Sequence, residues 1–122
     1  MPRVVHFEIA AKDPERASKF YSHVFDWKIN KWDGPEPYWL ATTGDKTEPG
    51  IDGGIMKPNK DLPHIVNTID VDSVDEYITR IKKEGGSIVK PKTAVPGVGY
   101  MAYCKDPEGN VFGIMQTDSK AS

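Results

Sequence analysis

Residues 12–29, KDPERASKFYSHVFDWKI, and residues 72–89, DSVDEYITRIKKEGGSIV, share one layout at an offset of sixty positions. Each stretch begins with a helix-capping residue, continues as an amphipathic helix and ends in a short strand pattern. Residues 51–56 and 111–116 are related by the same offset. These pairs predict that the two halves of the chain are copies of one supersecondary unit.

The first half shows strand and helix signals in turn. Residues 4–10 alternate apolar and polar side chains, which is typical of a half-buried strand. Asp13 is an N-cap candidate, and Pro14 suits the first helical position because no N–H donor is needed there. The apolar face of the helix is expected to consist of Ala17, Phe20, Tyr21, Val24 and Phe25. Three further strands are expected at 27–31, 38–43 and 51–56.

The second half follows the same order. Ser73 and Glu76 form a capping-box pattern, and the glycine pair Gly85-Gly86 predicts the end of the helix. Strands are expected at 65–71, 87–90, 99–104 and 110–116, with a loop over 91–98. One helix covers one face of a sheet, so neither βαβββ module is expected to fold alone. The chain is therefore interpreted as a single domain, 1–122, with modules 1–58 and 59–122.

Composition excludes several classes of protein. The 122 residues carry a formal net charge of −2, so the chain lacks the basic surface of a nucleic-acid-binding protein. The single cysteine cannot form an internal disulfide, which favours a reducing compartment. The sequence shows no signal-peptide pattern and no apolar run long enough to span a membrane. We expect a cytoplasmic protein without a membrane partner.

Four features resemble the glyoxalase/bleomycin-resistance/extradiol-dioxygenase superfamily, also called the vicinal oxygen chelate (VOC) superfamily: His6, Asp13-Pro14-Glu15-Arg16, Phe20-Tyr21 and the closing DPEGNVFG at 106–113. The resemblance covers nearly the whole chain. It implies an α+β fold in which two βαβββ modules form a cup of curved mixed sheets with the helices outside. It also implies a small-molecule ligand on the concave side and a homodimer.

The resemblance also identifies where a metal would be held. Metal enzymes of the superfamily take one ligand from the first strand and one from the fourth strand of each module. The corresponding positions here are His6, Gly53, Val66 and Gly113. A catalytic divalent metal usually needs three or more protein ligands, and glycine and valine have no donor atom in their side chains. We therefore expect neither a metal site nor another cofactor.

Two alternatives remain for the polar residues near the start of the chain. His6, Glu8 and His64 have the chemistry of a metal site, although no spacing brings His64 to the other two. Side chains alternate along a strand, so Glu8 shares a face with His6. Burying a carboxylate costs free energy unless it is paired or hydrated. Glu8 is therefore expected to line a ligand cavity. His6 is either its functional partner or an interior histidine held by a neighbour.

The aromatic residues are either a stacking wall for a ligand or core and dimer contacts: Trp32, Tyr38, Trp39, Tyr100 and Tyr103.

Three functions are compatible with these patterns. The first is a glyoxalase-like protein that binds a small molecule without the usual metal, as bleomycin-resistance proteins sequester a ligand; its contacts are His6, Glu8, Gly53, Val66 and Gly113. The second is a lyase or isomerase, or a relative of the dioxygenases. A lyase or isomerase would move a proton of a carbonyl compound, with Glu8 as the base and His6 as its partner. The third is a non-catalytic structural or interaction module. The sequence leaves open whether the protein is an enzyme.

Overall fold

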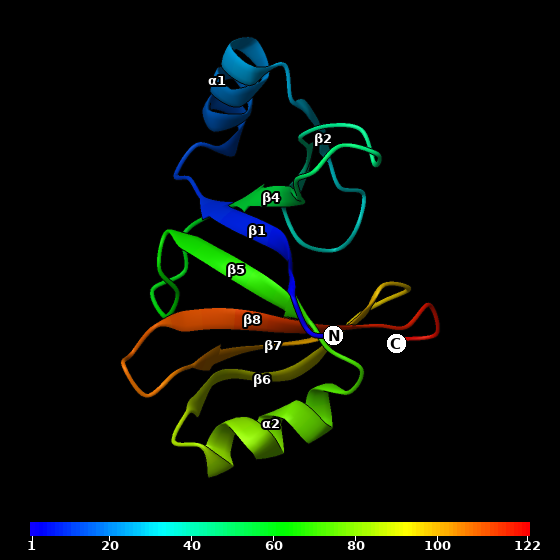
Figure 1. Ribbon diagram of the computed structural model, residues 1–122. Coiled ribbons are helices and arrows are strands. Elements are labelled where there is room, and N and C mark those ends of the chain that lie inside the picture. The colour runs from blue at the N-terminus through cyan, green and yellow to red at the C-terminus, as the bar shows by residue number, and fades with distance from the viewer. The chain divides into compact units, whose positions relative to one another are not determined.

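The computed structural model describes residues 1–122 and shows the same order of elements twice (Figure 1). The first copy contains β1 (Val4–Ala10), α1 (Pro14–Phe25), β2 (Lys28–Lys31), β3 (Tyr38–Thr42) and β4 (Asp52–Met56). The second contains β5 (Ile65–Asp70), α2 (Val74–Lys83), β6 (Ser87–Val95), β7 (Gly99–Lys105) and β8 (Val111–Thr117). The predicted α+β class with two βαβββ modules is confirmed.

Each module contains four strands of mixed direction. The first has the strand order β2-β3-β4-β1, and the second has the equivalent order β5-β8-β7-β6. The first and fourth strands of each module are parallel to one another, whereas the remaining neighbours are antiparallel. The first and fourth strands therefore lie side by side, which brings their residues onto common faces.

The chain divides into two compact units, and the division differs slightly from the expected boundary at residues 58 and 59. The units are His6–Val66 and, together, Met1–Val5 with Asn67–Ser122. The first residues of the chain belong with the second unit because the carbonyl of Arg3 accepts a hydrogen bond from the N–H of Asp70 at 2.9 Å. Both boundaries thus fall inside strands rather than in a linker.

The predicted helix caps are present. Asp13 Oδ1 accepts a hydrogen bond from the N–H of Arg16, and Ser73 Oγ accepts one from the N–H of Glu76, both at 3.1 Å. The capping box is only half formed, because Glu76 instead pairs with Arg80 at 2.8 Å. The helices are 12 and 10 residues long, and neither has the length and apolarity needed to span a membrane.

Strand β6 is longer than the sequence predicts. It runs from Ser87 to Val95 and includes much of the expected loop. Pro91 is tolerated because β6 is the edge strand of its sheet, where a missing N–H costs no ladder hydrogen bond. The register against β7 shifts twice, between Ile88 and Lys90 and between Lys90 and Thr93. The proline therefore marks an irregular edge strand and not its end.

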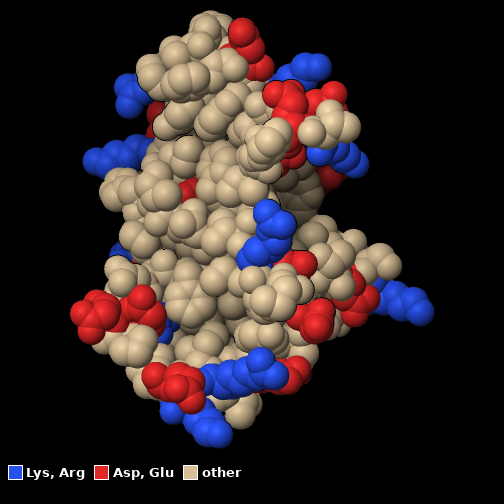
Figure 2. All heavy atoms as spheres, viewed as in Figure 1, with Lys and Arg blue, Asp and Glu red and all other residues tan.

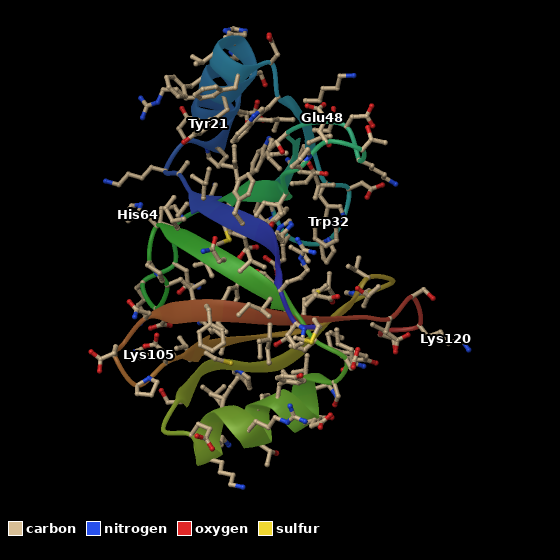
Figure 3. All side chains as sticks on the ribbon, in the orientation of Figure 1. Tyr21, Trp32, Glu48, His64, Lys105 and Lys120 are labelled. Atoms are coloured by element: carbon tan, nitrogen blue, oxygen red, sulfur yellow. The ribbon has the colours of Figure 1, made fainter.

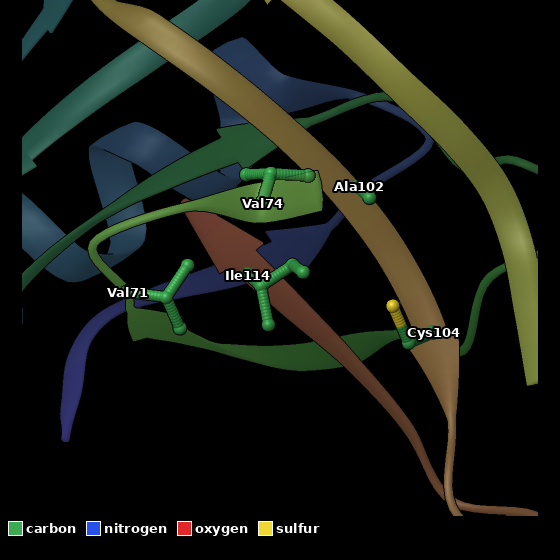
Figure 4. Packing of buried hydrophobic residues seen from close by; sticks show 5 residues of the cluster. All are labelled: Val71, Val74, Ala102, Cys104 and Ile114. Carbon is green, nitrogen blue, oxygen red and sulfur yellow. The ribbon is translucent and has the colours of Figure 1, made fainter. Parts of the chain in front are cut away.

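The second unit has a compact apolar core (Figure 4). Its buried members are Val71, Val74, Ala102, Cys104 and Ile114, and the apolar side of α2 packs against them. Cys104 is fully buried, and burial raises the pKa of its thiol to about 11. The thiol is therefore protonated at neutral pH and unsuited to act as a nucleophile.

Helix α1 differs from α2 in how its apolar residues are placed. The buried residues of α1 are Pro14 and Ser18. Phe20, Val24 and Phe25, expected on its apolar face, are 56%, 55% and 56% exposed. The sequence pattern identified the apolar residues of this helix, but much of their surface is open to solvent.

Candidate functional site

A chain of hydrogen bonds links three side chains on β1 and β3 of the first unit. Tyr38 Oη donates to Glu8 Oε2 at 2.8 Å and lies 2.7 Å from His6 Nε2. His6 and Glu8 are two residues apart on β1, so their side chains leave the strand on the same face. The structure brings together the two residues that the sequence singled out and adds Tyr38 between them.

The hydrogen bonds determine which nitrogen of His6 carries a proton. The phenol of Tyr38 has one proton, which it donates to Glu8. The short contact to His6 is then satisfied when Nε2–H donates to Tyr38 Oη. In the neutral ring this leaves Nδ1 as the acceptor. Glu8 and Tyr38 together therefore select one tautomer of His6.

Burial keeps the His6 ring neutral. The largest effect on its pKa is desolvation by burial, which lowers it, while the negative charges of Glu8 and Asp52 act in the opposite direction. His6 itself is half-buried, whereas Glu8 is only 6% exposed. The imidazole is thus the more accessible of the two groups and is an uncharged acceptor at neutral pH.

A glycine on β4 makes room for the Tyr38 ring. Glu8 of β1 pairs with Gly54 of β4, and a Cβ atom on Gly54 would overlap the ring of Tyr38. Trp32 holds the ring from another side: their centroids lie 6.3 Å apart at an interplanar angle of 78°. The N–H of Trp32 also donates to the carbonyl of Tyr38 at 2.7 Å. Gly54 and Trp32 together restrict where the phenol can lie.

Gly53, predicted from the sequence to belong to this site, lies on the opposite face of β4 from Gly54. A Cβ atom on Gly53 would meet the ring of Phe7 at 2.5 Å. Phe7 alternates with His6 and Glu8 along β1 and therefore leaves the strand on the opposite face. The assignment of Gly53 was wrong by one residue, and Gly54 is the glycine beside Glu8.

In the second module the fourth strand is shifted by one residue from the offset of sixty. Thr68 pairs with Gly113 just as Glu8 pairs with Gly54. The fourth strands are therefore related by 113 − 54 = 59 positions and not by sixty. The tripeptide Gly-Ile-Met occurs at 54–56 and again at 113–115, and it was the sequence signal for the true register.

The remaining predicted ligand residues offer no metal donors. Val66 is 1% exposed, and Gly113 has no side chain. His64, the third member of the alternative metal set with His6 and Glu8, is exposed just before β5 (Figure 3). Its backbone carbonyl accepts a hydrogen bond from the N–H of Ala10, the last residue of β1 and four positions beyond His6. No three His, Cys, Asp or Glu side chains form a group able to hold a metal ion. The residues present do not fit the metal centre of the family.

The aromatic residues, for which the sequence left open a stacking wall or core and dimer contacts, are divided between different roles. Trp32 and Tyr38 belong to the site, as described above. Trp39 is buried, and its Nε1–H donates to Glu15 Oε1 of α1 at 3.1 Å. Tyr100 lies under the ammonium group of Lys92, 4.7 Å from the ring centroid. Trp39 and Tyr100 are therefore involved in packing and a cation–π contact.

The lowered pKa of His6 predicts a specific pH dependence of stability. Unfolded His6 titrates near its ordinary value of 6.5, whereas the folded ring takes up a proton only at lower pH. The contribution of His6 to the free energy of unfolding is therefore complete above pH 6.5 and is lost as the pH falls below it. Urea titrations of the wild type and His6→Gln between pH 5 and 8 measure this difference. A His6-dependent loss of stability on raising the pH would contradict the assignment.

Comparison with known proteins is consistent with this architecture. The model of the Glyoxalase/Bleomycin resistance protein/Dioxygenase superfamily matches residues 3–114. A glyoxylase-like domain-containing protein of Didymella fabae is 32% identical over 120 residues, which cover 93% of this chain and 92% of the relative. CFP32 of Mycobacterium bovis, which carries a provisional glyoxylase name, is 29% identical over 119 residues. That match covers 91% of this chain but 44% of CFP32, so the chain spans less than half the length of this relative.

Solved structures agree at the level of the fold. The crystal structure of methylmalonyl-CoA epimerase from Mycobacterium tuberculosis superposes with a TM-score of 0.71 at 13% identity. The superposition covers 94% of this chain and 87% of the epimerase. At this identity the likeness shows a shared fold, and activity has to be argued from the residues of the site.

Proposed function

Because the chain belongs to the Glyoxalase/Bleomycin resistance protein/Dioxygenase superfamily, we propose that it binds a small molecule at His6 and Tyr38 without a divalent metal ion. The observation that supports this proposal is the hydrogen-bonded chain His6–Tyr38–Glu8. It fixes a neutral imidazole with Nδ1 as an acceptor beside the negative charges of Glu8 and Asp52. Such a site favours a neutral or cationic ligand that offers a hydroxyl or N–H donor.

The three side chains have different roles in this proposal. His6 is the contact to the ligand, because it is the more exposed of the two residues on β1. Tyr38 fixes the tautomer of His6. Glu8 is a positioning residue, since it is buried and accepts the proton of Tyr38. This assignment exchanges the roles that the sequence suggested for Glu8 and His6.

Ligand binding is tested by thermal shift and calorimetry with hydroxy-, keto- and amino-metabolites in the presence of EDTA. A ligand of the native state raises the unfolding midpoint. We expect His6→Ala to abolish that rise and Tyr38→Phe to weaken binding about tenfold, the effect of losing a hydrogen bond worth about 1.4 kcal/mol. Tyr100→Phe is the matched control, because that phenol lies in the second unit. Binding that requires an added metal, or that survives in His6→Ala, would overturn the proposal.

A proton-transfer reaction is the second candidate. The neutral His6 ring, held by Tyr38 and Glu8, has the arrangement of a general base with its orienting groups. His6 Nδ1 would remove a proton from the carbon beside a carbonyl group and return it to the same or an adjacent atom. Exchange of that proton for solvent deuterium, followed by NMR, tests the reaction. His6→Ala should slow it about 100-fold, and an unchanged rate would exclude His6 as the base.

The proposal also includes the cellular setting and the assembly. We place the protein in the cytoplasm, supported by the single cysteine, which is buried and unpaired. We also propose that it is a homodimer, supported by the exposed apolar residues Phe20, Val24 and Phe25 of α1. Cell fractionation tests the location, and recovery of the protein in a periplasmic or secreted fraction would contradict it.

A further inference from the structure

We infer that the apolar face of α1 docks against the same face of a second copy of this chain. The face, called here the α1 patch, consists of Ala17, Phe20, Tyr21, Val24 and Phe25. The inference rests on the homodimer proposed above, but it is independent of ligand binding at His6. Four features of the first unit support it: exposure, rigidity, area and charge.

Much of the apolar surface of the α1 patch is left uncovered by the rest of the unit. Phe20, Val24 and Phe25 are each more than half exposed, although they lie within one turn and a half of the same helix. Figure 2 shows the surface over α1 as mostly uncharged atoms with charged groups at its edges. Contiguous exposed apolar surface of this kind is typical of protein–protein contact sites.

The aromatic rings of the patch are already ordered. Tyr21 stacks on Trp27 with centroids 5.0 Å apart and an interplanar angle of 9°. Phe20 meets Tyr21 edge-on at 5.1 Å, and Trp27 in turn contacts Phe7 of β1 at 5.7 Å. A surface that is ordered before association loses less conformational entropy when it is buried.

The area of the patch suits the centre of an interface between copies. An aromatic side chain buries about 150–250 Å² when it is fully covered. Three aromatics that are already partly packed therefore supply part of the roughly 800 Å² that each partner buries in a standard interface. The surfaces at the two ends of α1 would have to supply the remainder.

Those two ends carry opposite charge. A surface depression of about 600 Å³ at the start of α1 is lined by two basic residues, Lys12 and Arg16, and one acidic residue, Asp13, and it shares Phe20 and Tyr21 with the patch. A second depression, of about 380 Å³, begins directly after the helix and is lined by two acidic residues, Asp26 and Asp45, and one basic residue, Lys28. A two-fold axis through an antiparallel pair of α1 helices sets the start of one helix against the end of the other. The end with a net positive charge in each copy then faces the end with a net negative charge in its partner, which favours a second copy as the occupant.

Sedimentation velocity over a range of protein concentrations tests the inference. We expect a dimer for the wild type and at least about tenfold weaker association for the double variant Phe20→Lys/Val24→Lys. Both residues are solvent-exposed, so the fold should persist, and circular dichroism verifies it. Val98→Lys is the control, because Val98 is a 42% exposed apolar residue in the other unit. A monomeric wild type, or a double variant that dimerises normally, would overturn the inference.

A charge exchange tests the antiparallel arrangement. Arg16→Glu and Asp45→Arg should each weaken dimerisation, and the combined variant should restore it. The side chain of Asp45 makes none of the hydrogen bonds of its turn, which use its backbone N–H and carbonyl. Additive losses in the combined variant would contradict the arrangement. Sedimentation is measured without any ligand, so a failure of the dimer is distinguished from a failure of ligand binding at His6.

Discussion

Replacing Ile55 by alanine is expected to lower the free energy of unfolding by about 2–5 kcal/mol, the usual cost of truncating a fully buried isoleucine. Ile55 is 0% exposed at the centre of the first sheet, where it pairs with Ile9 of β1 and Trp39 of β3. Neighbours on both sides are fixed by strand pairing, so they cannot collapse into the vacated space. The loss is therefore expected toward the upper part of that range.

The same substitution at Ile65 is the matched control. Ile65 is 59% exposed at the start of β5, and its truncation should change the free energy of unfolding by no more than about 0.5 kcal/mol. Urea denaturation of both variants and the wild type gives the comparison. Equal losses at the two positions would contradict the burial pattern of the first sheet.

The order of elements was predictable because its signals are local. Asp13 and Ser73 cap the two helices through hydrogen bonds to residues three positions later, and such contacts can be recognised within a few residues of sequence. The strands follow from alternation over short stretches. Their repetition in both halves then fixed the βαβββ order without any knowledge of distant contacts.

The register between paired strands was harder to predict from the sequence than the positions of the strands. A shift of one residue turns every side chain of a strand to its other face, and alternation alone does not indicate the partner strand. The offset of sixty, correct for the first strands and helices, becomes 59 in β4 and β8. Gly53 was therefore assigned in place of Gly54.

The central residue of the site was also hidden by distance along the chain. Tyr38 lies thirty residues from Glu8, and its role depends on β3 lying next to β4. In the sequence, Tyr38 is only one of several aromatic residues that are candidates for a ligand contact. Likewise, the spacing of Phe20 and Val24 identifies an apolar helix face without indicating what covers it.

Gly54→Ala provides the strongest test of the site. The added Cβ would overlap the ring of Tyr38, which is flanked by Trp32 and must therefore move from its position between His6 and Glu8. We expect a loss of about 1–3 kcal/mol in the free energy of unfolding from overpacking. We also expect loss of the Nε2–H tautomer of His6, observed in the ¹⁵N NMR spectrum of the imidazole, and loss of the thermal shift produced by a His6 ligand.

Gly113→Ala is the matched control for that test, because Gly113 is the equivalent position in the second module. Its added Cβ would come within 2.9 Å of the Oγ1 atom of Thr68, a hydroxyl that can move by rotation about one bond. Tyr38 belongs to the other unit, so the tautomer of His6 should be retained. If Gly54→Ala kept the wild-type spectrum and ligand shift, Tyr38 would not be the group that orients His6. If both variants lost them, the effect would be one of general stability and not of the glycine beside Glu8.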